Sequence, residues 1–222
     1  MVGFVARPHV PWLIMDWLNI HWPRGYHFLR FGTWNLNSAQ HWDSAWTRHG
    51  QDGFRASEEL STIRHRIIEL VPPKAVVLDA GCGVGELLAL LKKEKECRCF
   101  GLDISLVAVG KARQDRIPGC VSALPAIPYA SKTFDAVVCT ETLEHITNTN
   151  ETVAEIARVV RPGGIVIISV PHGTVDREEV HVHRFTVKRF KKTLLPYFHV
   201  DNIDVIVEGT NQTLLARTTR YQ

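Results

Sequence analysis

The stretch from Val76 to Glu86, VVLDAGCGVGE, constrains the fold of this 222-residue chain more than any other. Its apolar residues predict a buried strand, its glycines from Gly81 to Gly85 predict a tight turn, and Leu87–Lys95 predicts a helix. Glycine has no Cβ, so such a turn lets a ligand lie against bare backbone. The helix start adds unpaired N–H groups and a partial positive charge. We therefore expect a nucleotide-like ligand here.

The spacing of residues in this turn separates two classes of ligand. The nicotinamide fingerprint G-x-G-x-x-G needs a third glycine where this chain has Glu86. The observed pattern is Asp79-x-Gly81-x-Gly83-x-Gly85. It resembles motif I of the class I S-adenosylmethionine (SAM) methyltransferases. A carboxylate beside the turn suits the cationic amino and sulfonium groups of SAM.

Further segments extend this resemblance along the chain. A second strand is predicted over Cys99–Ile104, and Asp103 near its end can accept from both ribose hydroxyls. The alternative is that Asp103 caps a helix over Ser105–Gln114. Phe134–Glu141 looks like the family's fourth strand, and Arg161–Pro171 looks like its L-R-P-G-G turn and fifth strand. The resemblance implies an α/β fold, with a Rossmann-like, seven-stranded, mostly parallel sheet, helices on both faces and a reversed last strand.

The resemblance also implies which residues bind SAM. Many relatives use an acidic residue to bind the adenine amino group, but Ser122-Ala123-Leu124-Pro125 has no carboxylate. Ser122, the backbone or apolar contact with Leu124 must then take its place. The residues expected to contact SAM are Asp79, Gly81, Cys82, Gly83, Gly85, Asp103, Ile104, Ser122, Ala123, Leu124 and Thr140.

The methyl acceptor should lie beyond the end of the fourth strand, at the switch point of the sheet. In a helix, Glu141, Glu144 and His145 would share one face, so we expect these three to be catalytic. Two carboxylates and an imidazole can hold a divalent cation such as Mg²⁺, with Mn²⁺ or Zn²⁺ as alternatives. Such a metal would lower the pKa of a substrate hydroxyl. Without a metal, His145 can act as a base, or Glu144 and His145 can simply bond to helix backbone.

Two later histidines, His181 and His183, would point the same way in an extended segment. Either could complete the metal shell, and we take His183 as the fourth metal ligand, beside Glu141, Glu144 and His145. The E-x-x-E-H sequence followed by H-x-H-[KR]-F is similar to two branches of the superfamily. One is the small-RNA 3′-terminal 2′-O-methyltransferases, which hold a metal at a ribose end. The other is the ubiquinone-pathway O-methyltransferases, which methylate catechol hydroxyls.

Residues 1–56 form a Trp-rich extension ahead of a predicted methyltransferase domain over residues 57–222. The extension holds all six tryptophans, and Trp42 and Trp46 can share one face of a short helix. It is interpreted as a cap over the SAM and substrate pocket, as aromatics packed on the sheet, or as an interfacial membrane anchor. Tyr129 is a further candidate for the pocket wall.

Composition limits the remaining possibilities. A net charge of +3 is too small to indicate a nucleic-acid partner, and five scattered cysteines predict no disulfide framework. With no secretory leader and no run of 18 uncharged apolar residues, we expect a cytoplasmic protein, with peripheral membrane contact only through the Trp-rich segment. Val200–Val207 and Thr213–Ala216 predict a terminal hairpin, which would supply the reversed strand.

Together these features predict an enzyme that transfers a methyl group from SAM to an oxygen, or less readily a nitrogen, of a small or lipid-like acceptor. Two alternatives stay open. One is an RNA 3′-terminal 2′-O-methyltransferase, which should show steep salt dependence. The other is a non-catalytic SAM-binding subunit whose exposed tryptophans form an interface. The sequence does not indicate the oligomeric state.

Overall fold

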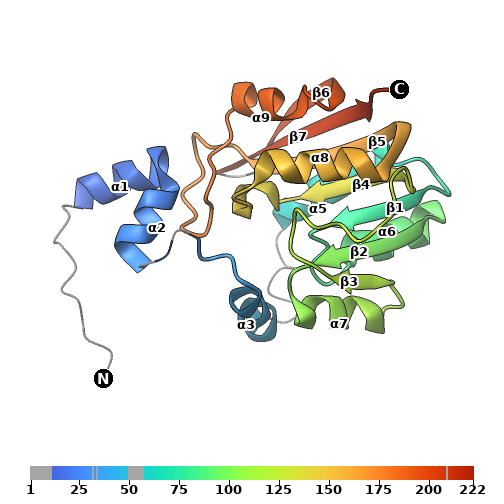
Figure 1. The fold of residues 1–222 in the computed structure, drawn as a ribbon, viewed down its shortest axis with the longest axis horizontal. Coiled ribbons are helices and arrows are strands. Elements are labelled where there is room, and N and C mark those ends of the chain that lie inside the picture. The colour runs from blue at the N-terminus through green and yellow to red at the C-terminus, as the bar shows by residue number, and fades with distance from the viewer. Residues whose placement is uncertain (1–11, 32, 34, 50–57, 209) are drawn as a thin grey trace.

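The computed structural model describes residues 12–31, 33, 35–49, 58–208 and 210–222. Within these residues, seven strands form one sheet in the order β3-β2-β1-β4-β5-β7-β6 (Figure 1). The strands are β1 Val76–Ala80, β2 Arg98–Asp103, β3 Gly119–Val121, β4 Phe134–Thr140, β5 Val160–Pro171, β6 Phe198–Glu208 and β7 Asn211–Arg220. All pairs are parallel except those of β7, which runs antiparallel to β5 and β6. The predicted fold class, with its reversed last strand, is confirmed.

Two apolar clusters explain why helices cover both faces of the sheet. Alternate side chains of a strand point to opposite faces, so Val77 joins one cluster and Leu78 the other. The Val77 side packs against α5 (Glu58–Leu70), α6 (Glu86–Lys95) and α7 (Leu106–Gln114). The Leu78 side packs against α8 (Thr149–Val159) and α9 (Val187–Leu194) (Figure 1).

Strand boundaries agree closely with the sequence except at β5 and in the terminal hairpin. The fifth strand begins at Val160, ahead of the expected turn, because Val160 pairs with Phe134 across a register shift in β4. The terminal hairpin is also longer than predicted, since pairing continues from Phe198 opposite Arg220 to Glu208 opposite Asn211. β5 therefore begins earlier, and β6 extends further at both ends, than their apolar runs alone indicate.

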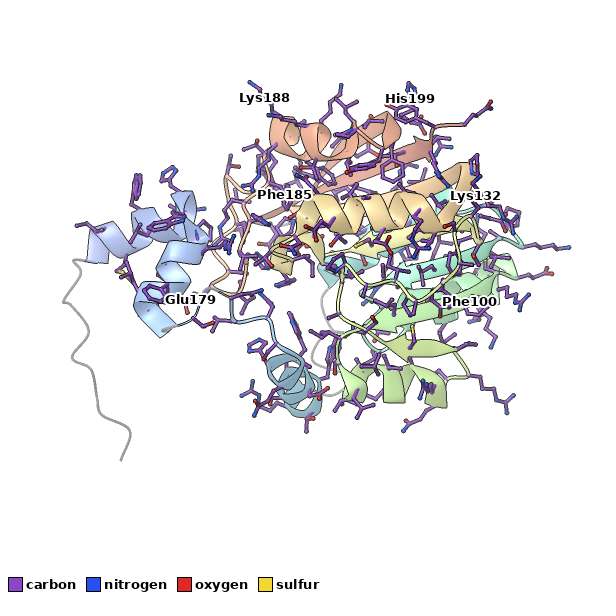
Figure 2. All side chains as sticks on the ribbon, in the orientation of Figure 1. Phe100, Lys132, Glu179, Phe185, Lys188 and His199 are labelled. Atoms are coloured by element: carbon purple, nitrogen blue, oxygen red, sulfur yellow. The ribbon has the colours of Figure 1, made fainter. Side chains whose placement is uncertain are left out.

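The N-terminal extension contributes three described helices. Helices α1 (Trp12–His21) and α2 (Pro23–Phe31) contact each other and stand beside the sheet, whereas α3 (Ala39–His49) lies against α7 (Figure 1). Glu179, from the loop after β5, lies next to α2, where it forms an ion pair with Arg30 (Figure 2). None of the described helices is long and apolar enough to cross a membrane.

Candidate functional site

The turn after β1 has the backbone conformation that its glycines predict. Gly81 and Gly83 have φ angles of 95° and 51°, in the left-handed region that side chains disfavour. A Cβ on Gly81 would lie 2.3 Å from Thr142 Oγ1, and one on Gly83 would lie 2.8 Å from the Trp46 ring. Two cavities, described below, open at this turn, and Gly85 lines neither of them. A Cβ on Gly85 would lie 3.0 Å from Ala112 of α7. Its left-handed backbone, with a φ of 83°, and its close approach to α7 both favour glycine.

Asp79, in β1 just ahead of this turn, is a buried carboxylate that lacks a partner. Its side chain is 2% exposed, and Oδ1 has no hydrogen-bond partner among the described residues. Burial, with the nearby charge of Asp103, raises the pKa of Asp79 to about 8. Such a carboxyl is stabilised by any cationic group that enters beside it.

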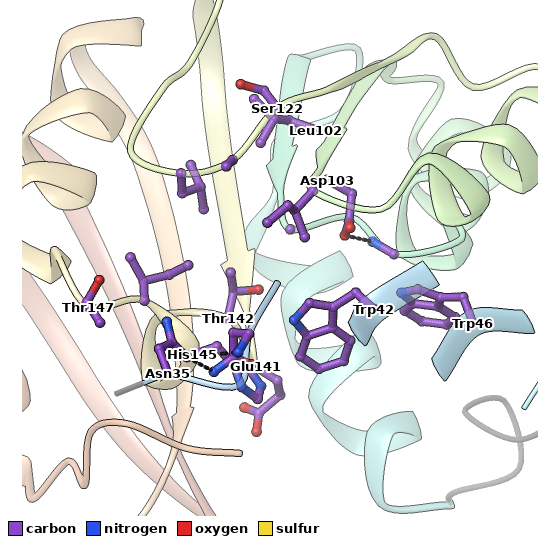
Figure 3. A pocket seen from close by; sticks show the side chains of 17 residues that line it. Asn35, Trp42, Trp46, Leu102, Asp103, Ser122, Glu141, Thr142, His145 and Thr147 are labelled. Carbon is purple, nitrogen blue, oxygen red and sulfur yellow. Dashed lines mark hydrogen bonds between the residues drawn. The ribbon is translucent and has the colours of Figure 1, made fainter. Parts of the chain in front are cut away.

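Asp103, at the end of β2, holds the glycine turn in place. Its Oδ2 accepts from Gly83 N at 2.9 Å, and its Oδ1 accepts from Ser105 N at 2.8 Å (Figure 3). Burial raises the pKa of Asp103, although these backbone hydrogen bonds oppose the shift. Ser105, rather than Asp103, caps α7, because its side chain accepts from Ala108 N. Each Asp103 oxygen keeps a lone pair for a further donor.

These groups open into a cavity of about 210 Å³ (Figure 3). Seven of the expected SAM residues line it, namely Gly81, Gly83, Asp103, Ile104, Ser122, Ala123 and Leu124. The remaining Asp79, Cys82 and Thr140 line an adjoining cavity that shares the glycine turn. The Ser122 hydroxyl already donates to Ala126 O at 2.8 Å. Tyr129 lines neither of these two cavities and packs between Phe100 and Phe134 instead.

Helix α3 forms one wall of the first cavity. Trp42 and Trp46 share a face of it and line the cavity, as their spacing predicted (Figure 3). Asp43 fixes the helix to α7, because its Oδ1 accepts from Ser105 Oγ at 2.6 Å and from Val107 N at 3.1 Å. Lys111 adds a bond of 2.6 Å from Nζ to the Trp46 carbonyl. Asn35 and Asn37 also line this cavity, and no sequence pattern indicated them.

The predicted helix face at the end of β4 is wrong. Glu141 lies outside any helix with a φ of 46°, because its N–H is held by Ser169 of β5, and only Leu143–His145 forms a short 3₁₀ helix. The three residues nevertheless line one cavity, since Glu141, Glu144 and His145 all border the cavity that adjoins the glycine turn. Glu141 Oε1 accepts from Ser169 Oγ at 2.7 Å, and burial raises the pKa of Glu141 to about 7.

Glu144 and His145 meet a third residue, His181, from the loop after β5. One ligand atom from each lies within 4.8 Å of the others, and all three side chains are buried. Both Glu144 carboxylate oxygens and His145 Nδ1 lack hydrogen-bond partners in the described part of the chain. Burial raises the pKa of Glu144 well above its ordinary value and, together with His181, lowers the pKa of His145 to about 3. His145 is therefore neutral near pH 6, and burial favours the protonated form of Glu144.

His183 does not join this cluster, contrary to the expected fourth metal ligand. Val182 N and His183 N both donate to the Glu144 carbonyl, so the chain turns here and the two histidines diverge. His183 Nδ1 accepts from Arg189 Nη2 at 2.9 Å, in a separate groove. The H-x-H spacing indicated His181 as well as His183, but no pattern indicated Asp176, whose Oδ1 lies 2.9 Å from His181 Nδ1.

Comparison with known proteins places this geometry in a family. A family model described as a methyltransferase domain matches residues 52–216. The methyltransferase GfsG of Streptomyces halstedii is 31% identical over 154 residues, which cover 64% of this chain and 54% of that protein. The ubiquinone biosynthesis O-methyltransferase of Thiobacillus denitrificans is 34% identical over 125 residues, covering 52% of this chain and 53% of that one. The chain thus spans about half the length of these curated relatives.

A solved structure shares the fold at lower identity. It is the complex of a methyltransferase with the Trm112 methyltransferase activator of Haloferax volcanii, which matches with a TM-score of 0.71 and 22% identity, over 82% of this chain and 98% of that one. Because the family model spans most of the chain and the sheet order agrees, the protein belongs to the methyltransferase-domain family and has the fold of the class I SAM-dependent methyltransferases.

Proposed function

We propose that this protein transfers a methyl group from SAM to an oxygen of a small or lipid-like acceptor, with nitrogen as a less favoured acceptor atom. The observation that carries the proposal is the partnerless Asp79 carboxyl beside a turn of bare backbone at Gly81 and Gly83. An amino acid ammonium placed there would pair with Asp79. Bound SAM supplies an electrophilic methyl carbon, and everything else must come from the chain.

The residues that line the cavity supply the remaining proposed contacts with the cofactor. Asp103 accepts from two ribose hydroxyls with the lone pairs that its backbone bonds leave free. Ser122, Ala123 and Leu124 border the adenine, and apolar contact dominates because the Ser122 hydroxyl is already bonded to Ala126 O. Cys82, Ile104 and Thr140 complete the walls.

The acceptor is positioned by Glu141, Glu144 and His145. His145 is neutral at physiological pH, and its unpartnered Nδ1 can accept the proton of an acceptor hydroxyl. Trp42, whose ring centroid lies 4.9 Å from that of His145, covers this side of the cavity and excludes water. Aligning the hydroxyl in a dry site accounts for much of the expected rate enhancement.

A divalent cation is a second candidate for the same cluster, in place of a direct base. The unpartnered oxygens of Glu144 favour it, because buried polar atoms without partners commonly mark an ion or water position. We infer that Glu144, His145 and His181 would hold it, with Glu141 nearby, and that His183 would not. A cation here would lower the pKa of the acceptor hydroxyl. Two imidazoles and a carboxylate suit Zn²⁺, Mn²⁺ or Fe²⁺ better than Mg²⁺.

Two other functions deserve direct comparison in one assay. An RNA terminus is disfavoured by the net charge of +3. A non-catalytic SAM-binding subunit is suggested by exposed Trp17 on α1 and exposed Trp22 at the junction with α2, which could form an interface. The same tryptophans would suit peripheral membrane contact.

The test is turnover of SAM to S-adenosylhomocysteine with catechols, phenols, a lipid quinol, an RNA oligonucleotide and cell extract, each with and without a chelator. We expect product with a hydroxyl acceptor at a rate that barely changes with salt. Turnover lost on chelation and restored by Mn²⁺ or Zn²⁺ would select the cation over the direct base. SAM binding without turnover under every condition would refute the enzyme and favour the binding subunit.

A further inference from the structure

A buried ion pair lies next to the acceptor side of the site and outside the cofactor cavity. Asp176 and Arg184, both in the loop between β5 and α9, are each 7% exposed. Arg184 Nη1 donates to Asp176 Oδ2 at 2.9 Å, and Nη2 donates to Glu178 O at 2.8 Å. Burying two charges costs several kcal/mol per ion before their attraction compensates, so stability alone is a weak reason for such a pair. We therefore expect the ion pair to hold a neighbouring group in place.

That neighbouring group is His181. The second oxygen of Asp176, Oδ1, lies 2.9 Å from His181 Nδ1 and also accepts from Glu178 N at 3.0 Å. Burial pushes the pKa of Asp176 upward, but His181 and Arg184 outweigh it and hold that pKa below its ordinary value. A carboxylate only accepts, so Nδ1 must carry the proton of the neutral imidazole.

The other face of His181 belongs to the acceptor side. Its ring centroid lies 4.7 Å from that of His145, in an edge-to-face arrangement. His181 also borders two cavities that Glu141 borders as well. With Nδ1 committed to Asp176, Nε2 is the nitrogen that remains for a ligand in those cavities.

We propose that Asp176 is a positioning residue that holds His181 in the Nδ1–H tautomer, so that Nε2 presents a lone pair to the acceptor hydroxyl or its cation. Arg184 keeps the carboxylate of Asp176 oriented, and Asn19 of α1 accepts from Arg184 Nη2 at 2.8 Å. The N-terminal extension thereby contributes a buried amide to the support of the site. The use of His181 rests on the proposed methyl transfer, whereas its tautomer does not.

Asp176→Asn tests the tautomer with almost no change in volume. Arg184 is charged and has only donors, so the new amide should turn its oxygen to the guanidinium and its NH₂ to His181 Nδ1, at the expense of the hydrogen bond from Glu178 N. That nitrogen must then accept, and the proton moves to Nε2. Asp176→Ala is the second variant, because it removes the acceptor altogether and should also release the Nδ1–H tautomer.

The readout is the pair of imidazole ¹⁵N resonances of His181 in an NMR spectrum, recorded at a pH at which the ring is neutral. The resonances are assigned by their absence from the spectrum of His181→Gln. We expect Nδ1–H in the native protein and a shift toward Nε2–H in both variants. Asp201→Asn is the matched control, since Asp201 also sits between an arginine and a histidine, Arg217 and His199, on the distant β6–β7 surface. It should leave the His181 signals unchanged.

Turnover separates this proposal from the proposed function. Asp176→Asn should lower kcat tenfold or more while the Kd for SAM stays within twofold, and Asp201→Asn should change neither. Nε2–H in the native protein, or signals unmoved in both variants, would overturn the positioning role. A change of tautomer with unchanged kcat would show that His181 takes no part in methyl transfer, but it would leave the proposed methyl transfer itself intact. Absence of turnover in the native protein would instead sink the proposed function and leave the tautomer result standing.

Discussion

The proposed cofactor half and the proposed acceptor half of the site are built in different ways. Most of the cofactor half comes from neighbouring strand ends, where Asp79, Gly81, Gly83 and Asp103 follow one another within a short stretch of chain. The acceptor half joins the end of β4, the loop after β5 and two helices of the N-terminal extension. The first is fixed by local backbone geometry, and the second by contacts between distant segments.

The two halves share one electrostatic property despite this difference. Asp79 in the first and Glu144 in the second are buried carboxyls without hydrogen-bond partners among the residues that the structure describes. Burial raises the pKa of both, which favours the neutral form of each until a cationic or donor group arrives. Both halves are therefore prepared for a ligand at a cost in the stability of the free protein.

The largest expected effect separates the halves. In His145→Ala we expect kcat to fall by about 10²–10⁴-fold, the usual contribution of a positioned acid or base, while SAM affinity stays within about twofold. The reason is that His145 lines the cofactor cavity only at its acceptor end, whereas the backbone turn and Asp103, which we propose bind the cofactor, make no hydrogen bond to it. Formation of S-adenosylhomocysteine gives kcat, and titration calorimetry gives the affinity.

His145→Gln guards against a folding artefact, because it keeps the site polar and filled. His199→Ala is the matched control, since that side chain is 74% exposed on β6. Equal losses of turnover and of SAM affinity in both His145 variants would show that the two halves are not separable. Full activity would place the acceptor elsewhere.

The sequence predicted the strand, turn and helix of the proposed cofactor half well because their signals are local. Alternating glycines, an acidic residue at each strand end and apolar runs specify strand, turn and helix without reference to the rest of the chain. Gly83 and Asp103 thus line the cavity as expected, and the sheet has the expected reversed strand. Gly85 lines neither cavity, and the sequence alone does not separate a glycine needed for backbone conformation and packing on α7 from one needed for a ligand.

The acceptor half was predicted only in part because its order depends on distant contacts. The helix expected from Glu141 onward does not form, since Ser169 of β5 holds the Glu141 backbone. The sequence does not show that the Glu144 carbonyl accepts from both Val182 N and His183 N, and this contact makes His181 and His183 diverge. Asp176 could not be identified at all, because an acidic residue in a loop carries no pattern of its own.

A second, smaller effect should appear at Asp79. Asp79→Asn should weaken SAM binding by roughly 1.5–3 kcal/mol, the cost of losing a charge-assisted hydrogen bond. It should also stabilise the free protein above pH 8. The native pKa of about 8 lies above the ordinary 3.8, so the folded state retains a proton that the unfolded chain has released, and wild-type stability falls as pH rises between these values. An asparagine has no such loss.

Calorimetric unfolding between pH 4 and pH 9, with SAM titrations of the same samples, measures both effects. The unfolding temperatures of the two proteins should converge near pH 4 and diverge as the pH rises. Asp135→Asn on β4 is a contrasting control, because that carboxylate accepts from Val76 N at 2.8 Å and pairs with Arg161. It should lose stability and keep its SAM affinity. A less stable Asp79→Asn protein at pH 9 would contradict the unpaired state of Asp79.

The smallest expected effect concerns α3, the element that touches both halves. Trp42 contacts His145, the Trp46 ring covers Gly83, and Asp43 fixes the helix by accepting from Ser105 and Val107 at the start of α7. Loss of such a capping carboxylate costs about 1 kcal/mol, so Asp43→Ala should weaken SAM binding about fivefold. Because the Ser105 hydroxyl and the Val107 N–H lower the pKa of Asp43, this stabilisation is present above the ordinary carboxyl pKa and is lost as pH falls through the lowered value.

Hydrogen exchange over α3, with SAM titrations at pH 7, checks this expectation against exposed Ser44→Ala on the same helix. If α3 links the halves, Asp43→Ala should speed hydrogen exchange in α3 and lower both SAM affinity and kcat. A variant confined to one half should lower only one of these two quantities. Faster exchange with unchanged affinity and kcat would show that α3 merely covers the site. The two halves would then be independent units that share only the carboxyl ends of β1 and β4.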